Sequence, residues 1–181
     1  DLSAYDLCLQ ALPMVHRLRD FESFVAARTL LERALKLDPG YTHAKALVCR
    51  LTDTARGERW LSLAEAARCL PLAEEVVADP RNDAMALAFA GVTFAFLGQQ
   101  QQRGLLVVQQ AHALNPNSSH VLNALGGVHG YLGNNKQAID HFTRSIWLNP
   151  LDPIIGQVRC GLGAALLHAE RVAEAVAALE Q

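Results

Sequence analysis

The sequence contains few charged side chains, and lysine is especially scarce. Charged residues make up 19% of the 181 positions, and the formal net charge is -2. The lysines are Lys36, Lys45 and Lys136, and the arginines are scattered without forming a basic stripe. Because binding to a phosphate backbone relies on a basic face, we do not expect nucleic acid to bind this chain directly.

Long apolar runs are also missing. No stretch approaches the roughly 20 apolar residues that a membrane-spanning helix needs, so no membrane association is expected. The composition is nevertheless 51% apolar and carries no signature of disorder, which predicts a buried core. The chain begins at Asp1 without a methionine or a signal peptide, which predicts a piece of a longer protein.

The four cysteines lack the spacing of a metal site or a redox motif. Cys8, Cys49, Cys69 and Cys160 lie far apart, with no C-x-x-C and no histidines at zinc-finger spacing. Four cysteines allow three disulfide connectivities, which remain open at this point. Isolated cysteines on apolar helical faces are more often reduced core residues, so we expect a reducing compartment and a cytoplasmic location.

Motifs for catalysis or cofactor binding are absent as well. The sequence shows no strand-like alternation and no glycine-rich phosphate loop. No serine or cysteine has a histidine at a spacing that indicates a catalytic pair. Gly126-Gly127-x-x-Gly130 lies in a helical pattern, which favours close helix packing over nucleotide binding. His120 and His129 are too far apart on one helix to chelate a metal ion. We therefore predict no catalytic residue, no metal and no cofactor in this region.

What the sequence does contain is a regular set of stops. Amphipathic stretches end at an acidic or amide residue followed by proline, at Leu37-Asp38-Pro39, Ala78-Asp79-Pro80, Leu114-Asn115-Pro116 and Leu148-Asn149-Pro150. The prolines are 41, 36 and 34 residues apart. Proline cannot continue a helix and disfavours helical geometry in the residue before it, so each stop marks the end of a helical hairpin.

These stops predict an all-α fold, a right-handed α-solenoid of about five helical hairpins. A single domain would cover residues 1–181, with hairpins at approximately 3–39, 41–80, 82–116, 118–150 and 153–181. Pro13 and Pro71 fall inside expected helices, and we expect a kink or break near Cys69 to Pro71. The last unit stops at Gln181 without a polar cap, which predicts that the chain continues or that this end docks on something. Trp60 and Trp147 are predicted to be packing residues.

The repeats resemble the tetratricopeptide repeat (TPR) family, whose period is 34 residues. The likeness is greatest from Ala84 to Pro150. Signature positions of the family are occupied there by Leu125-Gly126, Gly133, Ala138, Phe142 and Pro150. The chain departs from the family pattern in the first helices, where Leu87 and Leu122 replace the usual tryptophan and Phe94 and His129 replace tyrosine.

A narrower likeness concerns three short segments. They are similar to segments in the C-terminal TPR region of bacterial class III adenylate cyclase-type proteins, and of winged-helix regulators of comparable layout. The segments are Asp1-Leu2-Ser3-Ala4-Tyr5-Asp6-Leu7, Ala113-Leu114-Asn115-Pro116-Asn117-Ser118 and Leu148-Asn149-Pro150-Leu151-Asp152-Pro153. The cyclase-linked type is the more similar of the two. The resemblance implies that the parent protein is a signalling enzyme, whereas this region is a regulatory part of it.

The TPR architecture implies a partner-binding concave face, formed by the first helices of successive hairpins. Counting from the stops, the predicted lining consists of Lys45, Cys49, Thr52, Met85, Ala88, Val92, Phe96, His120, Asn123, Gly127, Tyr131, Gln157, Cys160 and His168. Only Lys45 and Asn123 suit a clamp for a terminal carboxylate, so such a clamp is not expected. The face is apolar and rich in small residues, which suits an apolar peptide or helix.

The predicted function is therefore that of a non-catalytic protein–protein interaction scaffold. The expected partner is a protein, a peptide or a neighbouring domain of the same chain, and the favoured context is regulation of an adenylate cyclase-type protein. Two alternatives remain open. One is the same region in a winged-helix transcriptional regulator, and the other is a homo-oligomerisation module that forms, for example, a homodimer.

Overall fold

The computed structural model describes residues 2–180; Asp1 and Gln181, including the open end expected at Gln181, lie outside this range. Within it the chain forms eleven α-helices and one short 3-10 helix, η1. Their bounds are α1 Ala4–His16, α2 Phe21–Leu37, α3 Thr42–Gly57, α4 Leu63–Ala66, η1 Ala67–Cys69, α5 Leu70–Ala78, α6 Ala84–Phe96, α7 Gln101–Leu114, α8 Ser119–Tyr131, α9 Asn135–Leu148, α10 Ile155–His168 and α11 Val172–Leu179.

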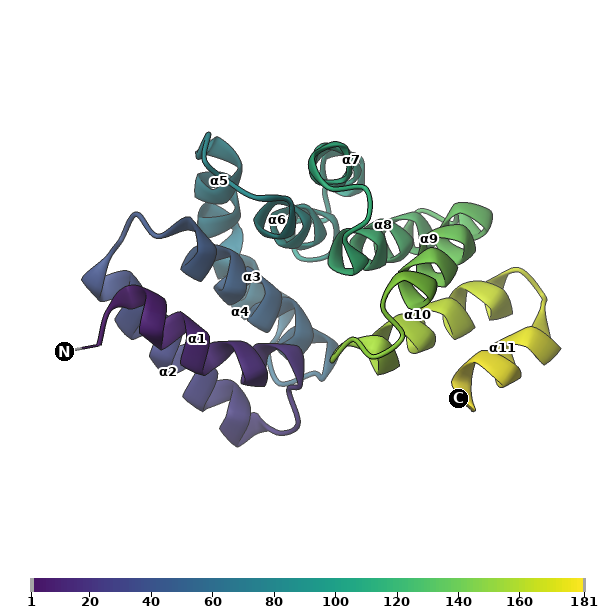
Figure 1. The fold of residues 1–181 in the computed structure, drawn as a ribbon, viewed down its shortest axis with the longest axis horizontal. Helices are drawn as coiled ribbons and strands as arrows, with labels where there is room; N and C mark the ends of the chain where they lie inside the picture. Colours follow the sequence, from purple (N-terminus) through teal and green to yellow (C-terminus); the bar gives the residue numbers. More distant parts are fainter. Residues whose placement is uncertain (1, 181) are drawn as a thin grey trace.

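Neighbouring helices pair into hairpins, and the hairpins follow one another along the molecule (Figure 1). Helix α1 packs on α2, α3 on α5, α6 on α7, α8 on α9 and α10 on α11. The first helices of the hairpins also contact each other in the order α1, α3, α6, α8 and α10. This arrangement confirms the predicted all-α solenoid of helical hairpins.

The proline stops coincide with helix ends. Helices α2, α5, α7 and α9 end one residue before the acidic or amide residue of each stop. Asp38, Asn115 and Asn149 have φ between -137° and -145°, outside helical geometry, as expected for residues that precede proline. Several helices then restart on side-chain caps; for example, Asp83 accepts a hydrogen bond from the Ala86 N–H at 2.7 Å.

The two internal prolines behave differently. Pro13 lies within α1, close to its end, and the helix continues to His16. Pro71 occupies the start of α5, where a missing N–H costs little because the first helical N–H groups have no partner within the helix. The second half of this hairpin is divided into α4, η1 and α5. The predicted break near Cys69 to Pro71 is therefore confirmed.

Small residues allow helices to approach closely within a hairpin. A Cβ atom added at Gly91 would lie 2.5 Å from Val108 Cγ2, and one added at Gly104 would lie 2.5 Å from the Gly91 carbonyl oxygen. Helices α6 and α7 could not keep this separation with larger side chains, since close-packed interiors have no room for an added methyl group.

The core follows the inner contacts of the hairpins and includes the fully buried side chains of Phe94, Leu31, Leu47 and Leu122. Burying each of these contributes about 1.5–3 kcal/mol. A smaller cluster around Phe142 and Leu166 joins α9, α10 and α11. No helix in residues 2–180 is both long enough and apolar enough to cross a bilayer.

The two tryptophans have different environments. Trp60 packs against Phe21 and Phe24, with ring centroids 6.0 and 6.1 Å apart, so the prediction of a packing role is confirmed for this residue. Trp147 is 79% exposed beside a hollow between α9, α10 and α11, and the same prediction is wrong for it. The physical reason is that the core of this part of the molecule forms on another face of α9, around Ala138, Ile139 and Phe142.

Candidate functional site

The first helices α6, α8 and α10 lie side by side and enclose a groove that we call the inner groove. It consists of two adjoining hollows of about 230 and 260 Å³. Both hollows are lined by Phe96, Gly127, Phe142 and Gly161. Their further lining residues are Arg50, Phe89, Val92, His120, Asn123, Ala124, Gly126, Gly130, Tyr131, Gln157, Ala164, Ala165 and His168.

Glycine residues form the floor of the inner groove. A Cβ atom at Gly126 or Gly161 would meet the Phe142 ring at 2.7 or 2.6 Å, so this ring from α9 occupies the space beneath both glycines. Gly127 differs, because its nearest neighbour would be the Phe96 ring at 3.6 Å, an ordinary contact distance. The absence of a side chain at Gly127 thus leaves free space in the groove.

Aromatic side chains form one wall. The rings of Phe96 from α6 and Tyr131 from α8 meet edge to face, with centroids 5.1 Å apart and an interplanar angle of 76°. Tyr131 remains 55% exposed. Large, rigid and partly exposed aromatic side chains are typical anchors of protein interfaces, because they offer contact area at low entropic cost.

The end of the groove near α3 is polar. Arg50 of α3 donates a hydrogen bond to Gln157 Oε1 of α10, and its guanidinium carbon lies 5.9 Å from the centre of the Phe89 ring. The His120 ring stands edge to face with Phe89 and lies 5.0 Å from the ring of His16. Arg50, His120 and Gln157 line the same hollow and can exchange hydrogen bonds with a polar backbone.

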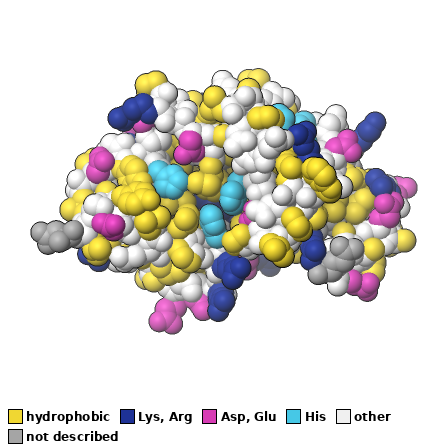
Figure 2. Space-filling view, in the orientation of Figure 1, with side chains coloured by type: hydrophobic (Ala, Val, Ile, Leu, Met, Phe, Trp, Pro, Cys, Tyr) yellow, Lys and Arg dark blue, Asp and Glu magenta, His cyan; other side chains and the backbone are white. Residues whose placement is uncertain are grey.

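Burial keeps the two histidines neutral at this end. Burial lowers the pKa of His16 to about 4, and the charges of His120 and Arg50 act in the same direction. Burial also lowers the pKa of His120, against the opposing charge of Asp152. Histidine side chains gather near the middle of the face seen in Figure 2, between hydrophobic surfaces. His120, which lines the groove, can therefore offer a ligand an uncharged ring as a hydrogen-bonding group, whereas His16 lies behind it and does not line either hollow.

The structure brings together most of the residues predicted on the last three hairpins; Met85, Ala88 and Cys160 are the exceptions. The inner groove is lined by Val92, Phe96, His120, Asn123, Gly127, Tyr131, Gln157 and His168. Cys160 is exposed but lies outside both hollows. These eight predicted residues therefore lie together along one groove.

The predicted residues of α3 and the start of α6 do not join this groove. Lys45, Cys49 and Ala88 are buried, so a partner on the open surface cannot reach them. The prediction that these three residues line the concave face is wrong for this reason. Lys45 Nζ pairs with Glu75 Oε2 of α5 at 2.6 Å, which compensates the charge of a lysine that is only 8% exposed. Thr52 lines a separate hollow beside α2, and Met85 packs half-buried against the core.

Sequence reasoning missed Arg50, Phe89 and Gly161. Arg50 follows the predicted Cys49 directly, so the expected face of α3 was rotated by one residue, or about 100°. Gly161 lies four residues after the predicted Gln157, and continuing that helical spacing would have found it. Phe89 follows Ala88 and shows the same one-residue rotation at the start of α6.

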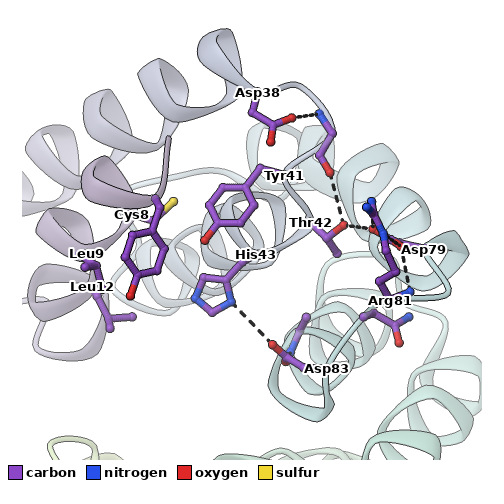
Figure 3. A pocket seen from close by; sticks show the side chains of 14 residues that line it. Cys8, Leu9, Leu12, Asp38, Tyr41, Thr42, His43, Asp79, Arg81 and Asp83 are labelled. Atoms are coloured by element: carbon purple, nitrogen blue, oxygen red, sulfur yellow. Dashed lines mark hydrogen bonds and ion pairs between the residues drawn. The ribbon is translucent and has the colours of Figure 1, made fainter. Parts of the chain in front are cut away.

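A larger hollow of about 490 Å³ lies at the loops between the first three hairpins (Figure 3). Its polar groups largely bind one another. Thr42 donates a hydrogen bond to Asp79, Arg81 pairs with the same carboxylate at 3.1 Å, and His43 lies 3.8 Å from Asp83. Hydrogen bonds from Arg81 and Thr42 hold the pKa of Asp79 well below its usual range. These contacts join two loops and leave few groups for a ligand.

Chemistry-bearing clusters are not a feature of the described chain. Within residues 2–180, no group of three or more histidine, cysteine, aspartate or glutamate side chains has the arrangement of a metal site. The three histidines His112, His129 and His141 do approach each other, and the rings of the last two stack at 5.4 Å.

Comparisons of the sequence with known proteins give no match. No model of a known protein family matches the chain, and no curated protein does.

Comparisons with solved structures, in contrast, give many matches. TTC0263, a thermophilic TPR protein of Thermus thermophilus, is 21% identical with a TM-score of 0.67, over 97% of this chain and 88% of that one. A chain of the Cut9–Hcn1 hetero-tetramer of the APC/C is 18% identical with a TM-score of 0.69, and the match covers 99% of this chain. This chain spans only 32% of the length of that protein.

YrrB, described as a TPR protein with an unusual peptide-binding site, is 16% identical with a TM-score of 0.51, over 98% of this chain and 84% of that one. Identities of this size establish a shared fold only. The chain has the α-solenoid fold of TPR proteins.

Proposed function

We propose that this chain is a non-catalytic scaffold that binds a protein segment in the inner groove. The observation that carries the proposal is the free space above Gly127, which lies between the aromatic wall of Phe96 and Tyr131 and the polar end at Arg50. An apolar anchor side chain of a peptide or helix would fill this space. Asn123 and Gln157 would hydrogen-bond its backbone, as small sets of polar groups do in largely apolar sites.

The groove can be tested with a displayed library of random peptides selected on the unmodified chain. Binding of the selected peptides is then compared by fluorescence anisotropy for Gly127→Leu, Phe96→Ala and Tyr131→Ala. Gly127→Leu fills the groove, and the alanine variants remove its wall, so each should weaken binding about tenfold or more. Gly156→Leu is the matched control, since a Cβ atom added there would have no atom within 4 Å. Equal affinity for all variants would refute the assignment.

The proposed biological context is regulation. Three short segments, one at the start of the chain and two at proline stops, resemble cyclase-linked TPR regions. This resemblance supports a role as the regulatory region of a bacterial adenylate cyclase-type signalling protein in the cytoplasm. A partner, or a neighbouring domain, would fill the groove and alter the output of the attached domain. The test deletes residues 1–181 from the parent protein and measures cyclic AMP synthesis and partner binding. If neither changes, the regulatory role is rejected.

Two alternative contexts lead to different measurements. In a winged-helix regulator, the same deletion would alter transcription from a target promoter and leave cyclic AMP synthesis unaffected. A homo-oligomerisation module would give a mass of two or more chains by light scattering, whereas a monomer at all concentrations would exclude it.

A further inference from the structure

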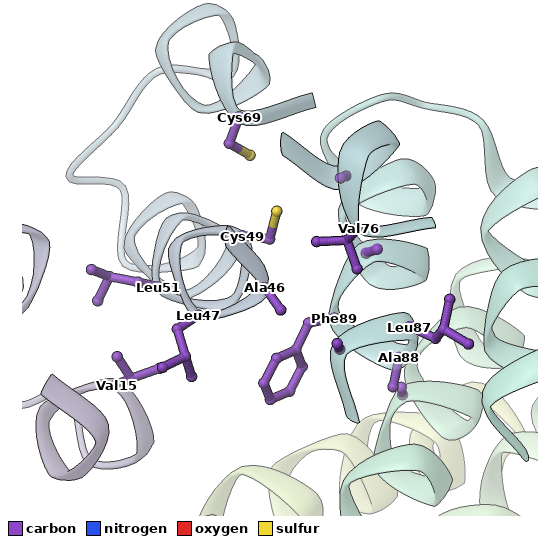
Figure 4. Packing of buried hydrophobic residues seen from close by; sticks show 14 of the residues in the cluster. Val15, Ala46, Leu47, Cys49, Leu51, Cys69, Val76, Leu87, Ala88 and Phe89 are labelled. Atoms are coloured by element: carbon purple, nitrogen blue, oxygen red, sulfur yellow. The ribbon is translucent and has the colours of Figure 1, made fainter. Parts of the chain in front are cut away.

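Two cysteines that are distant in sequence meet in the core. Cys49 belongs to α3 and is fully buried, whereas Cys69 ends the 3-10 helix η1 and is 5% exposed. Figure 4 shows the sulfur atom of each pointing toward the other across the space between α3 and η1. Both thiols are free in this structure. Neither is accounted for by the inner groove.

The environment distinguishes the two thiols. The Cys69 thiol and burial both raise the pKa of Cys49, and the charge of Asp53, one helical turn further along α3, acts in the same direction. Cys49 therefore stays protonated. Cys8 is also buried, with its pKa raised to about 11, but burial is the cause there and no second sulfur takes part.

Only one of the pair can be reached from outside. Cys69 lines a hollow of about 260 Å³ between α2, α3 and the α4–η1–α5 segment, and Cys49 does not. Charged side chains of Arg28, Glu65 and Arg68 also line this hollow. Since a water molecule takes about 30 Å³ in the liquid, a small polar oxidant such as a peroxide fits inside.

We propose that Cys69 and Cys49 form a peroxide-reactive dithiol, in which Cys69 is oxidised first and Cys49 then closes an intramolecular disulfide. This site is separate from the groove, so it stands or falls independently of the proposed function.

The reaction balances in two steps with hydrogen peroxide as the oxidant. The Cys69 sulfur attacks one peroxide oxygen; an S–O bond forms, the O–O bond breaks, and the thiol proton leaves with the second oxygen as water. Cys69 is then a sulfenic acid. The Cys49 sulfur attacks the Cys69 sulfur, the S–S bond forms and the S–O bond breaks. The hydroxide that leaves takes the Cys49 proton as a second water, so two electrons have passed from the sulfurs to the peroxide.

The disulfide would bind η1 covalently to α3. The η1 segment joins two helices at the break before Pro71, and it is held by few local hydrogen bonds because a 3-10 turn is short. Closing the loop between residues 49 and 69 restricts the unfolded chain, so we expect the oxidised protein to melt at a higher temperature than the reduced one.

The experiment uses the full chain with Cys8→Ser and Cys160→Ser, in which Cys49 and Cys69 are the remaining thiols. After hydrogen peroxide treatment, thiols are counted in denaturant and tryptic peptides are weighed by mass spectrometry. Trypsin releases Cys49 in 46–50 and Cys69 in 69–81. We expect loss of both thiols, one cross-linked peptide pair lighter by two hydrogen atoms, and full reversal by dithiothreitol.

Single variants test the order of the steps. In Cys49→Ser, Cys69 should form a sulfenic acid that dimedone traps, whereas in Cys69→Ser the Cys49 thiol should survive the same treatment. Circular dichroism verifies that each variant remains helical. The cross-link is also measured in the unmodified chain, so this result does not depend on the folding of the variants. Absence of the cross-link at peroxide doses that oxidise the exposed Cys160 of the unmodified chain would overturn the proposal. Labelling of Cys49 by dimedone in place of Cys69 would also overturn the proposal.

Discussion

At the scale of single residues, consecutive glycines of α8 have opposite roles. Gly126 lets the Phe142 ring approach the helix axis, whereas Gly127 leaves space that no side chain of residues 2–180 fills. The difference arises because neighbouring helical residues point about 100° apart, so one faces α9 and the other faces the groove. A glycine in a helix costs stability relative to alanine, and only Gly126 offsets that cost through packing.

Replacing each glycine with alanine should therefore change stability in opposite directions. Gly126→Ala places a methyl group 2.7 Å from the Phe142 ring and should lower the free energy of unfolding by about 1–3 kcal/mol. Gly127→Ala should raise it by about 0.5–1 kcal/mol. Urea unfolding followed by circular dichroism measures both, each serving as the other's control. Equal effects of the same sign would contradict the packing described here.

Asp53 provides a second prediction at this scale, based on pH. Its carboxyl accepts a hydrogen bond from Thr93 at 2.9 Å, its other oxygen has no partner in the described structure, and burial raises the pKa to about 7 from 3.8. Between these values the unfolded state releases the proton while the folded state keeps it, so this group makes stability fall as pH rises from about 4 to 7.

Asp53→Asn should remove the loss of stability that Asp53 causes as the pH rises from about 4 to 7. The variant should be more stable than the unmodified chain at pH 8, by a few kcal/mol at most since each pKa unit corresponds to about 1.4 kcal/mol, and the difference should vanish near pH 4. Urea unfolding at a series of pH values measures it. Asp140→Asn, at an exposed position, is the control and should show no such trend. A stability difference independent of pH would refute the assignment.

At the scale of elements, polar side chains join one hairpin to the next. Asp152 lies in the loop between α9 and α10 and is 5% exposed. Its carboxylate accepts hydrogen bonds from the Ser119 hydroxyl of α8 at 2.6 Å, the Asn149 amide at 2.9 Å and the Ile154 backbone N–H at 3.1 Å. In the second hairpin, Thr42 at the start of α3 donates an equivalent hydrogen bond to Asp79 in the loop after α5.

Asp152→Ala should weaken the junction between the last two hairpins. Loss of the shared acceptor leaves the buried Ile154 N–H and two partly buried donors without this partner, which should cost about 1–3 kcal/mol. Hydrogen exchange measured by mass spectrometry should then accelerate in α10 and α11 and remain unchanged in α1 and α2. Asp140→Ala serves as the exposed control. Faster exchange spread evenly over all helices would contradict a local role.

At the scale of the whole molecule, the core is unevenly distributed. The larger cluster of buried side chains extends from Leu7 to Val128, and the smaller one joins α9, α10 and α11 around Phe142. In a solenoid each hairpin contacts its neighbours only, so its stability is roughly the sum of local and neighbour terms. Unequal clusters should therefore give unequal local stability.

We expect α10 and α11 to lose protection from hydrogen exchange at a lower urea concentration than α6 and α7. The reason is that α11 buries little beyond Ala175, whereas most of α6 is buried. Exchange at increasing urea, followed peptide by peptide, measures the difference. A single common transition for all helices would show instead that the molecule unfolds as one cooperative unit.

Much of the architecture was predictable because its signals are local. Proline constrains its own backbone and that of the residue before it, so Asp38, Asn115 and Asn149 end helices whatever lies around them. The break at Pro71 was predictable for the same reason. Gly127 and Tyr131 of α8 follow helical spacing, and the structure places both in the groove.

The face of α3 was not predictable from spacing. Lys45 would be expected at the surface, yet α5 supplies Glu75 as its partner and covers it. Cys49 is buried because other helices pack on α3, and its thiol faces Cys69 of η1. In both cases the deciding contact comes from a segment twenty or more residues away.

The sequence by itself determined that this chain is a row of helical hairpins, because turn chemistry and apolar periodicity act over a few residues. Only the tertiary structure decided which faces of those hairpins remain open. It also decided that Phe142 fills the space beneath Gly126 and Gly161 while the space at Gly127 stays free, and that the thiol of Cys49 faces that of Cys69. Such features depend on the rotation of one helix against another, and that rotation is set by the packing of side chains that are distant in sequence.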